Sequence, residues 1–285
     1  MISSNRISDF FIFSNLYVAL PVSALALSSF YLMHESVNWV PIAFIYLATL
    51  ALYNIHRLVG IHQIPQSELG TRHTWSLKNL VFVKILIAIG IVGMLGLAFW
   101  LSLEQIIILA IPAAIASGYT LPIYKSGSKI WRFRDIPFLK IWLVSFTVSF
   151  ITTYFPLSSS MPLSWLNSPE VHWLFISRVF FIFAITIPFD VRDLKFDTPG
   201  KINTVPMLFG VQKSKQVALL CLLLFSGISF WLFRFNTSAS FALLLSALIA
   251  GWIINTCEED SNEYYFSFFA EGTMLIQFGL VYLAR

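Results

Sequence analysis

The sequence has few charged residues: Asp, Glu, Lys and Arg together make up only 11% of its 285 residues. A soluble domain typically has about 25% charged and about 45–50% apolar residues. This chain is 58% hydrophobic and contains 28 Phe and 9 Trp, which excludes an ordinary soluble domain and indicates a membrane protein. Cysteine is also scarce, with only Cys221 and Cys257, far apart beside apolar segments. This number and spacing exclude a disulfide framework and a cysteine zinc site.

The sequence contains several long apolar segments. A helix needs about 20 mostly apolar residues to cross a bilayer, with a range of roughly 17–25. Nine segments fit this length, some of them marginally, because the second is short and ends in polar residues. We therefore expect an all-α, polytopic membrane helix bundle of about nine transmembrane helices. The expected spans are residues 10–32, 39–54, 80–101, 105–123, 137–154, 172–189, 216–234, 238–256 and 264–283.

The distribution of Lys and Arg predicts the orientation of these spans, because both residues accumulate in cytoplasmic loops. With a cytoplasmic N-terminus, the inner loops after spans 2, 4 and 6 are basic, whereas the outer side has only Arg234 and Arg285. The net charge of +4 therefore reflects cytoplasmic loops, and we expect no nucleic-acid partner. No linker divides the chain, so we expect one domain, residues 1–285. We expect an integral, multi-pass protein of the inner (cytoplasmic) membrane, in contact with the lipid bilayer.

Three of the 14 acidic residues stand together at the end of the sixth expected span, in "IPFDVRDLKFDTPGKINTVP". Asp190, Asp193 and Asp197 are spaced i, i+3 and i+7, which places them on one face of a helix. Aligned carboxylates suit Mg²⁺, which takes one or two carboxylates and completes its shell with water and substrate phosphates. Nearby Lys and Arg residues suit the phosphates. The alternative is a polar helix end whose aspartates pair with Arg192, Lys195 and neighbouring cations.

The continuation of this stretch favours the first interpretation. "DVRDLKFDTPGKINTVPMLFG" resembles the second aspartate-rich motif of the UbiA-type intramembrane prenyltransferases. In that motif, D-x-x-D-x-x-x-D is followed by a Gly, a Thr, often a Pro, and a Gly. The corresponding residues here are Gly200, Thr204, Pro206 and Gly210. The stretch "SGYTLPIYK" is similar to the Tyr-Ser/Thr-x-x-Pro…Lys signature of the same enzymes and places Tyr119, Pro122 and Lys125. The expected spans and orientation also resemble this family.

The sequence departs from the family at its first aspartate motif, approximately N-D-x-x-D-x-x-x-D. The corresponding stretch is "YNIHRLVGIH", in which Asn54 fits the leading asparagine. The three aspartate positions are held by Ile55, Leu58 and His62, and none of these is a carboxylate ligand for Mg²⁺. Three readings stay open: Arg57 and Arg72 replace one metal ion, the substrate is a different phosphorylated or lipid molecule, or the protein binds lipid and no longer catalyses.

The resemblance implies a UbiA-like membrane prenyltransferase that transfers a prenyl group from a polyprenyl diphosphate to a membrane-soluble aromatic or lipid acceptor. It implies that Asp190, Asp193 and Asp197 are the catalytic carboxylates and hold the cofactor Mg²⁺. The expected substrate-binding residues are Asn54, Arg57, Arg72, Tyr119, Lys125 and Lys201. The alternative is an atypical or inactive relative that acts as a lipid-binding or accessory membrane protein, or a transporter.

Two further features have no place in that site. Arg178 lies inside the sixth expected span, about 18 Å of helix from Asp190 at a rise of about 1.5 Å per residue. An intramembrane charge is a functional candidate, but Arg178 could instead snorkel to the outer interface or cap backbone carbonyls of a neighbour. The histidines His56, His62 and His73 follow the second span, and their spacing fits no standard zinc site. We expect them to contact a substrate headgroup or pack within the loop.

Overall fold

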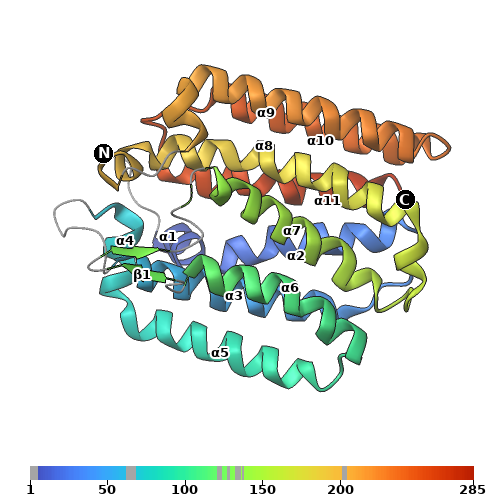
Figure 1. The fold of residues 1–285 in the computed structure, drawn as a ribbon, viewed down its shortest axis with the longest axis horizontal. Coiled ribbons are helices and arrows are strands. Elements are labelled where there is room, and N and C mark those ends of the chain that lie inside the picture. Colours follow the sequence, from blue (N-terminus) through green and yellow to red (C-terminus); the bar gives the residue numbers. More distant parts are fainter. Residues whose placement is uncertain are drawn as a thin grey trace.

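Helices that run roughly along one axis make up most of the computed structural model of the chain (Figure 1). The structure describes residues 6–61, 69–120, 124–126, 129–131, 136, 138–200 and 204–285, without the side chains of 6–7, 120, 124–131 and 195–200. The helices are α1 (Arg6–Phe13), α2 (Leu16–Leu32), α3 (Trp39–Ile61), α4 (Thr71–Lys78), α5 (Leu80–Ala98), α6 (Leu103–Thr120), α7 (Leu139–Leu157), the 3₁₀-helix η3 (Ser164–Asn167), α8 (Pro169–Gly200), α9 (Val205–Leu232), α10 (Thr237–Thr256), the π-helix η4 (Tyr265–Ala270) and α11 (Glu271–Leu283).

The predicted polytopic membrane fold is confirmed, but the count of nine spans is not. Among the described residues, seven helices are long and apolar enough to cross a membrane: α3, α5, α7, α8 as far as Leu194, α9, α10 and the continuous η4–α11 helix. The apolar helices α2 and α6 fill the two remaining expected positions, but they are shorter. Each of the nine expected segments is therefore mostly helical in its described residues, and the helices in two of them are shorter than the seven candidate spans.

The first expected span, residues 10–32, is broken into α1 and α2. Asn15 separates the two helices with a left-handed backbone conformation (φ 63°), which asparagine tolerates better than most residues. Its side-chain amide donates to Asn54 Oδ1 at 3.0 Å, so the break is tied to α3. The periodicity of an apolar run does not reveal such a break.

A short hairpin, the helix α4 and the 3₁₀-helix η3 are additions to the expected spans in the part of the chain that the structure describes. Strands β1 (Tyr124–Ser126) and β2 (Lys129–Trp131) pair antiparallel, with Tyr124 opposite Trp131. They lie in the basic loop between α6 and α7. Figure 1 shows β1 at the same end of the bundle as α1 and α4.

The basic loops gather at one end of the bundle, as their charge predicts. In Figure 1, α1, α4, β1 and the C-terminal end of α8 lie at one end, and the C-terminus of the chain lies at the other. The assignment of the basic end to the cytoplasm stays a prediction from the distribution of Lys and Arg.

Helices α2 and α8 form the centre of the bundle. α8 packs against α7 and α9, whereas α2 packs against α3, α7 and α11. The most apolar stretch of α8 is 67% buried, compared with 17% for that of α5, whose Val81 and Val92 are exposed and would face lipid. α5 packs closely only against α3, where a Cβ on Gly90 would lie 2.8 Å from the Leu47 carbonyl oxygen. The space enclosed by α2, α3, α7, α8 and α11 contains the candidate site.

Arg178 is buried at the junction of α2, α7 and α8, and does not snorkel. Its guanidinium donates to Ser29 Oγ at 2.6 Å, Thr152 O at 2.8 Å, Ser28 Oγ at 3.0 Å and Thr153 Oγ1 at 3.2 Å. Only 2% of the residue is exposed. Of the two structural roles expected for Arg178, the contacts favour the capping of neighbouring backbone and hydroxyl oxygens over snorkelling.

Candidate active site

A cavity of about 190 Å³ lies between α1, α2, α3, α4, α7, α8, η4 and α11. Its polar lining consists of Asn15, Tyr53, Arg57, Arg72, Lys140, Thr186, Asp190, Arg192, Asp193, Ser267 and Glu271. Its apolar lining consists of Ile12, Val18, Val22, Val144, Val148, Ile182, Ile185, Phe189 and Met274. The cavity therefore combines a charged region with a hydrocarbon-like region.

Two of the predicted aspartates share a lysine. Asp190 and Asp193 lie one turn apart on α8, and both line the cavity. Lys140, in the first turn of α7, approaches Asp190 Oδ1 at 2.9 Å and Asp193 Oδ2 at 3.8 Å. The ammonium group thus supplies the cation that two neighbouring carboxylates need.

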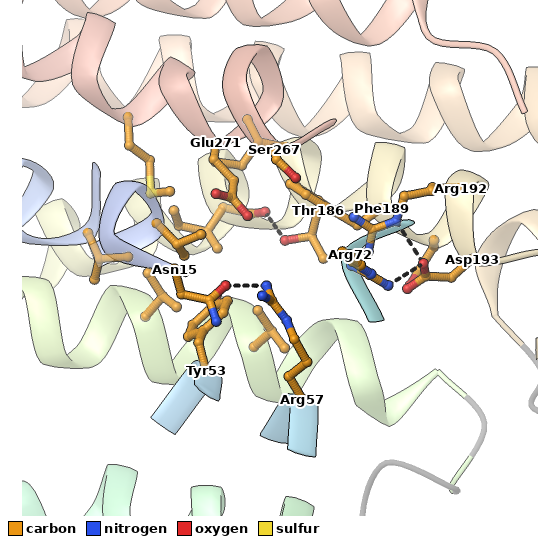
Figure 2. Close-up of a pocket in the computed structure, with 18 of the residues that line it drawn as sticks. Asn15, Tyr53, Arg57, Arg72, Thr186, Phe189, Arg192, Asp193, Ser267 and Glu271 are labelled. Carbon is orange, nitrogen blue, oxygen red and sulfur yellow. Dashed lines mark hydrogen bonds and ion pairs between the residues drawn. The ribbon is translucent and has the colours of Figure 1, made fainter. Parts of the chain in front are cut away.

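Two arginines complete the charged end of the cavity. Asp193 accepts from Arg192 Nε at 2.8 Å and forms an ion pair with an Arg72 terminal nitrogen at 3.6 Å. Glu263 pairs with the same arginines, at 3.5 Å from Arg72 Nε and 3.3 Å from an Arg192 terminal nitrogen. Figure 2 shows Arg72, Arg192 and Asp193 grouped on one side of the pocket. We call Arg72, Lys140, Asp190, Arg192 and Asp193 the charged cap.

Arg57 reaches the cavity from α3 without a carboxylate partner in the described part of the chain. Its guanidinium donates to the Phe13 carbonyl, to Asn15 Oδ1 and to Ser76 Oγ, the last at 3.4 Å. All three hydrogen-bond partners are neutral, and Glu271 and Glu263 interact with Arg57 only electrostatically, so the guanidinium can pair with an anion in the cavity. Figure 2 shows Arg57 beside Asn15.

The structure does not place Asn54 in the cavity lining. The side chain is fully buried, and its amide donates to Ser14 O at 3.0 Å and to Leu50 O at 2.9 Å. Asn54 accepts from Asn15, which in turn accepts from Arg57. In this structure Asn54 therefore acts on the site indirectly, by holding the turn that orients Arg57.

The remaining predicted residues are only partly described. Tyr119 contacts His56 edge-on with ring centroids 5.5 Å apart and is not among the residues that line the cavity. Asp197 and Lys125 have described backbones, in α8 and β1, but their side chains lie outside the description. Lys201 and His62 lie outside the described residues altogether. The roles of these residues stay predictions.

Burial and neighbouring arginines lower the pKa values of two residues on α4, Arg72 and His73. Burial lowers the pKa of Arg72, and the nearby Arg192 lowers it further, while Asp193 opposes the shift. Burial, together with the charges of Arg72 and Arg57, lowers the pKa of His73 to about 4. His73 is therefore neutral at pH 7, and its side chain is buried.

The described donors fit one Mg²⁺ and not two. Asp190 and Asp193 are hard oxygen donors one turn apart, with a cation already between them. On the opposite helix, Ile55 and Leu58 offer no donor. Among the described residues no group of three or more His, Cys, Asp or Glu is arranged for a metal. A single ion that uses the α8 carboxylates and substrate phosphates agrees with this donor set.

Sequence reasoning missed several residues of the site, above all Lys140 and Glu271. Each is a lone charge within an expected apolar span, 137–154 and 264–283, and Glu271 is the only acidic residue in the latter. An ionisable residue inside a span is a functional candidate, so the sequence alone identifies Lys140 and Glu271 as candidates. Tyr53 and Asn15 carry no comparable signal, because uncharged polar residues are common near the ends of spans.

The sequence matches no protein-family model and no curated protein. Solved structures do resemble it. A UbiA homologue from Archaeoglobus fulgidus bound to GPP and Mg²⁺ has a TM-score of 0.64 and 13% sequence identity, over 95% of this chain and 99% of that chain. The apo structure of a UbiA homologue from Aeropyrum pernix K1 has a TM-score of 0.65 and 12% identity, over 94% and 97%.

A third similar structure is digeranylgeranylglyceryl phosphate synthase, with a TM-score of 0.54 and 13% identity over 98% of this chain and 96% of that chain. At these identities the similarity bears on the fold alone, and it extends over almost the whole chain in each comparison. The chain therefore has the UbiA-type fold.

Proposed function

We propose that the chain is a UbiA-like membrane prenyltransferase, which transfers a prenyl group from a polyprenyl diphosphate to an aromatic or lipid acceptor. The observation that carries this proposal is a single cavity, inside a membrane helix bundle, that is lined by the charged cap and by apolar side chains. A prenyl diphosphate has the same division, with a charged head and a hydrocarbon tail. The protein would act as an integral, multi-pass protein of the inner membrane.

The head of the substrate would lie at the charged cap. Arg57 has only neutral hydrogen-bond partners and is the first candidate to bind a phosphate, since an arginine can hold phosphate oxygens with two nitrogens. Arg72, Lys140 and Arg192 would add positive charge once a phosphate competes for their carboxylates. Lys125, Lys201 and Tyr119 remain proposed contributors to headgroup binding, and Asn54 is a proposed indirect contributor through Asn15 and Arg57.

The tail would lie along Val144, Val148 and Ile182 in the apolar region of the cavity. These walls keep water away from an allylic carbocation, which water would otherwise capture. Asp190, Asp193 and Asp197 would hold one Mg²⁺, which when bound adds positive charge at the leaving diphosphate and so favours C–O cleavage. Arg57 belongs to α3, a helix that contains no carboxylate for a second ion. Similar structures bound to GPP or DMAPP with Mg²⁺ support this proposal by analogy of fold.

The test is binding and turnover of geranyl diphosphate (GPP) by the purified protein. We expect binding that is strengthened by Mg²⁺ and weakened by excess inorganic pyrophosphate, because the head makes the charged contacts. Incubation with radiolabelled GPP, Mg²⁺ and a membrane lipid extract should yield a prenylated lipid and pyrophosphate. Octyl phosphate is a matched control that has an anionic head but no allylic leaving group.

The absence of carboxylates on α3 also favours a second candidate, a lipid-binding or accessory protein without catalysis. Such a protein would bind GPP but release no pyrophosphate under any metal condition. A chain that does not bind GPP at all contradicts both functions.

Replacement of Lys140 by methionine tests whether the Lys140 ammonium group competes with a metal ion for Asp190 and Asp193. The Lys140 Nζ lies within 4 Å of both α8 carboxylates, so its removal leaves them without that counter-charge. We expect the ligand-free Lys140→Met variant to bind Mn²⁺, a paramagnetic substitute for Mg²⁺, about tenfold more tightly, which equals about 1.4 kcal/mol. Electron paramagnetic resonance of free Mn²⁺ measures the change, with Lys84→Met as a control outside the cavity lining. Unchanged Mn²⁺ affinity would show that Lys140 does not compete with a metal.

A further inference from the structure

Glu271 is a cavity-lining carboxylate outside the charged cap. It is the first residue of α11 and directly follows the π-helix η4. It lines the cavity, and its Oε2 is buried without a hydrogen-bond partner in the described residues. Asp190 and Asp193, by contrast, each have a cationic partner. A buried carboxylate oxygen without a partner is unfavourable for stability, so a functional role is the better explanation.

Glu271 lies deeper in the cavity than the cap. Figure 2 shows it on the opposite side of Thr186 from Arg72, Arg192 and Asp193. Thr186 is one turn before Asp190 on α8, about 6 Å further from the charged end at a rise of about 1.5 Å per residue. The Thr186 hydroxyl already donates to Ile182 O at 2.7 Å, so it does not satisfy Glu271. Met274, one turn further along α11, belongs to the apolar lining.

This position lies at the border between the charged and apolar regions. If the diphosphate of a substrate occupies the cap and its tail occupies the apolar region, the first carbon of the prenyl chain lies at this border. The acceptor must reach the same carbon. Glu271 is therefore the described carboxylate best placed to meet an acceptor at the reacting carbon.

We propose that Glu271 is the catalytic base that removes the acceptor's proton, an inference that rests on the proposed prenyltransferase function. The C–O bond of the prenyl diphosphate breaks, and its electron pair leaves with the diphosphate. The nucleophilic atom of the acceptor, an oxygen, nitrogen or activated ring carbon, forms a bond to the first prenyl carbon. The proton on that atom passes to Glu271 Oε2 and later to solvent. The acceptor must therefore be a molecule that loses a proton when it is prenylated.

The groups around Glu271 are consistent with a carboxylate that changes charge during the reaction. It interacts electrostatically with Arg57, Arg72, Arg192 and Glu263. It also interacts with Tyr17 on α2 and Tyr53 on α3. None of these makes a described hydrogen bond to Oε2, so this atom is open to a ligand in the cavity.

The experiment compares Glu271→Gln and Glu271→Asp with wild type for GPP affinity and for the transfer rate to the lipid extract across pH. We expect Glu271→Gln to bind GPP as wild type does and to transfer about 100-fold more slowly, within the range for loss of a general base. The wild-type rate should fall as acid protonates the base, and this acid limb should be absent in Glu271→Gln. Glu271→Asp keeps the carboxylate and should retain the limb and recover part of the rate.

Glu263→Gln is the matched control, because Glu263 is an acidic neighbour that does not line the cavity. A Glu271→Gln variant with the wild-type rate and pH profile overturns the inference and leaves the proposed function intact. An equal loss of GPP affinity and of rate also overturns it, because that outcome shows a structural role. If Glu271→Gln does not purify, a Glu271→Asp variant with the full wild-type rate overturns the inference, because the shorter side chain withdraws the carboxylate from the acceptor. Wild-type protein that neither binds nor transfers GPP overturns the proposed function and the inference together.

Discussion

Replacement of Asp193 by alanine should lower Mg²⁺-dependent prenyl transfer about 1000-fold, the largest effect we expect on activity. Asp193 is the cap residue with the most ionic partners, since Arg72, Lys140 and Arg192 all approach its carboxylate. Its loss removes a proposed metal ligand and also takes from each of these three cations one of the two anions that position it. Both effects weaken the stabilisation of the leaving diphosphate.

The measurement is kcat/KM for GPP together with GPP affinity, so that lost binding is separated from lost chemistry. Glu263→Gln is the control, because Glu263 pairs with the same two arginines at similar distances but does not line the cavity. We expect that control to lower kcat/KM less than about tenfold. Equal losses in the two variants would indicate that the carboxylates only hold the arginines, and would contradict a direct role for Asp193.

The largest expected effect on stability comes from Arg178, and the conservative change should be the more harmful one. We expect Arg178→Lys to destabilise the protein by about 3 kcal/mol, because it keeps a buried charge but loses most of the donors that satisfy it. Arg178→Met should cost about half as much, since it removes the charge together with the donors. Ser28 and Ser29 keep hydrogen bonds to Leu25 O and Thr152 O in its absence.

Thermal unfolding in detergent checks this order. A loss of about 3 kcal/mol should lower the apparent Tm by about 6–10 °C for a chain of this size, if unfolding is reversible. Arg234→Lys is the control, because Arg234 is exposed beside Trp231 and Phe235. A methionine variant less stable than the lysine variant would mean that the positive charge itself stabilises the bundle.

The sequence predicts well those parts of the fold that depend on the composition and length of whole segments. Apolar length identifies the positions of the helices, and the i, i+3 spacing of Asp190 and Asp193 predicts their common face. Breaks in helices are less visible. Asn15 interrupts an apolar run by a local backbone conformation that its tertiary contact with Asn54 supports, and hydropathy does not record that contact.

The site is less predictable than the fold, because its partners come from distant parts of the chain. Lys140 is 50 residues before Asp190, and its proximity depends on the packing of α7 against α8. The resemblance to a family motif predicts Asn54 as a substrate contact, whereas the structure gives its amide three protein partners. A motif identifies which residue types occur, but the geometry of neighbouring helices decides which of them face the cavity.

The π-helix η4 has a consequence for how such a site changes over evolution. A π turn contains one residue more than an α turn, so the side chains that follow it are rotated by about 100° relative to an uninterrupted α-helix. The direction of the Glu271 side chain therefore depends on the π geometry of the segment Tyr265–Ala270 as well as on the identity of the residue. Substitutions in this segment that favour α geometry at unchanged length would turn the carboxylate away from the cavity while the helix continues to cross the membrane. A change of helical geometry, without any change of the residue at position 271, would thus remove the proposed base from the site.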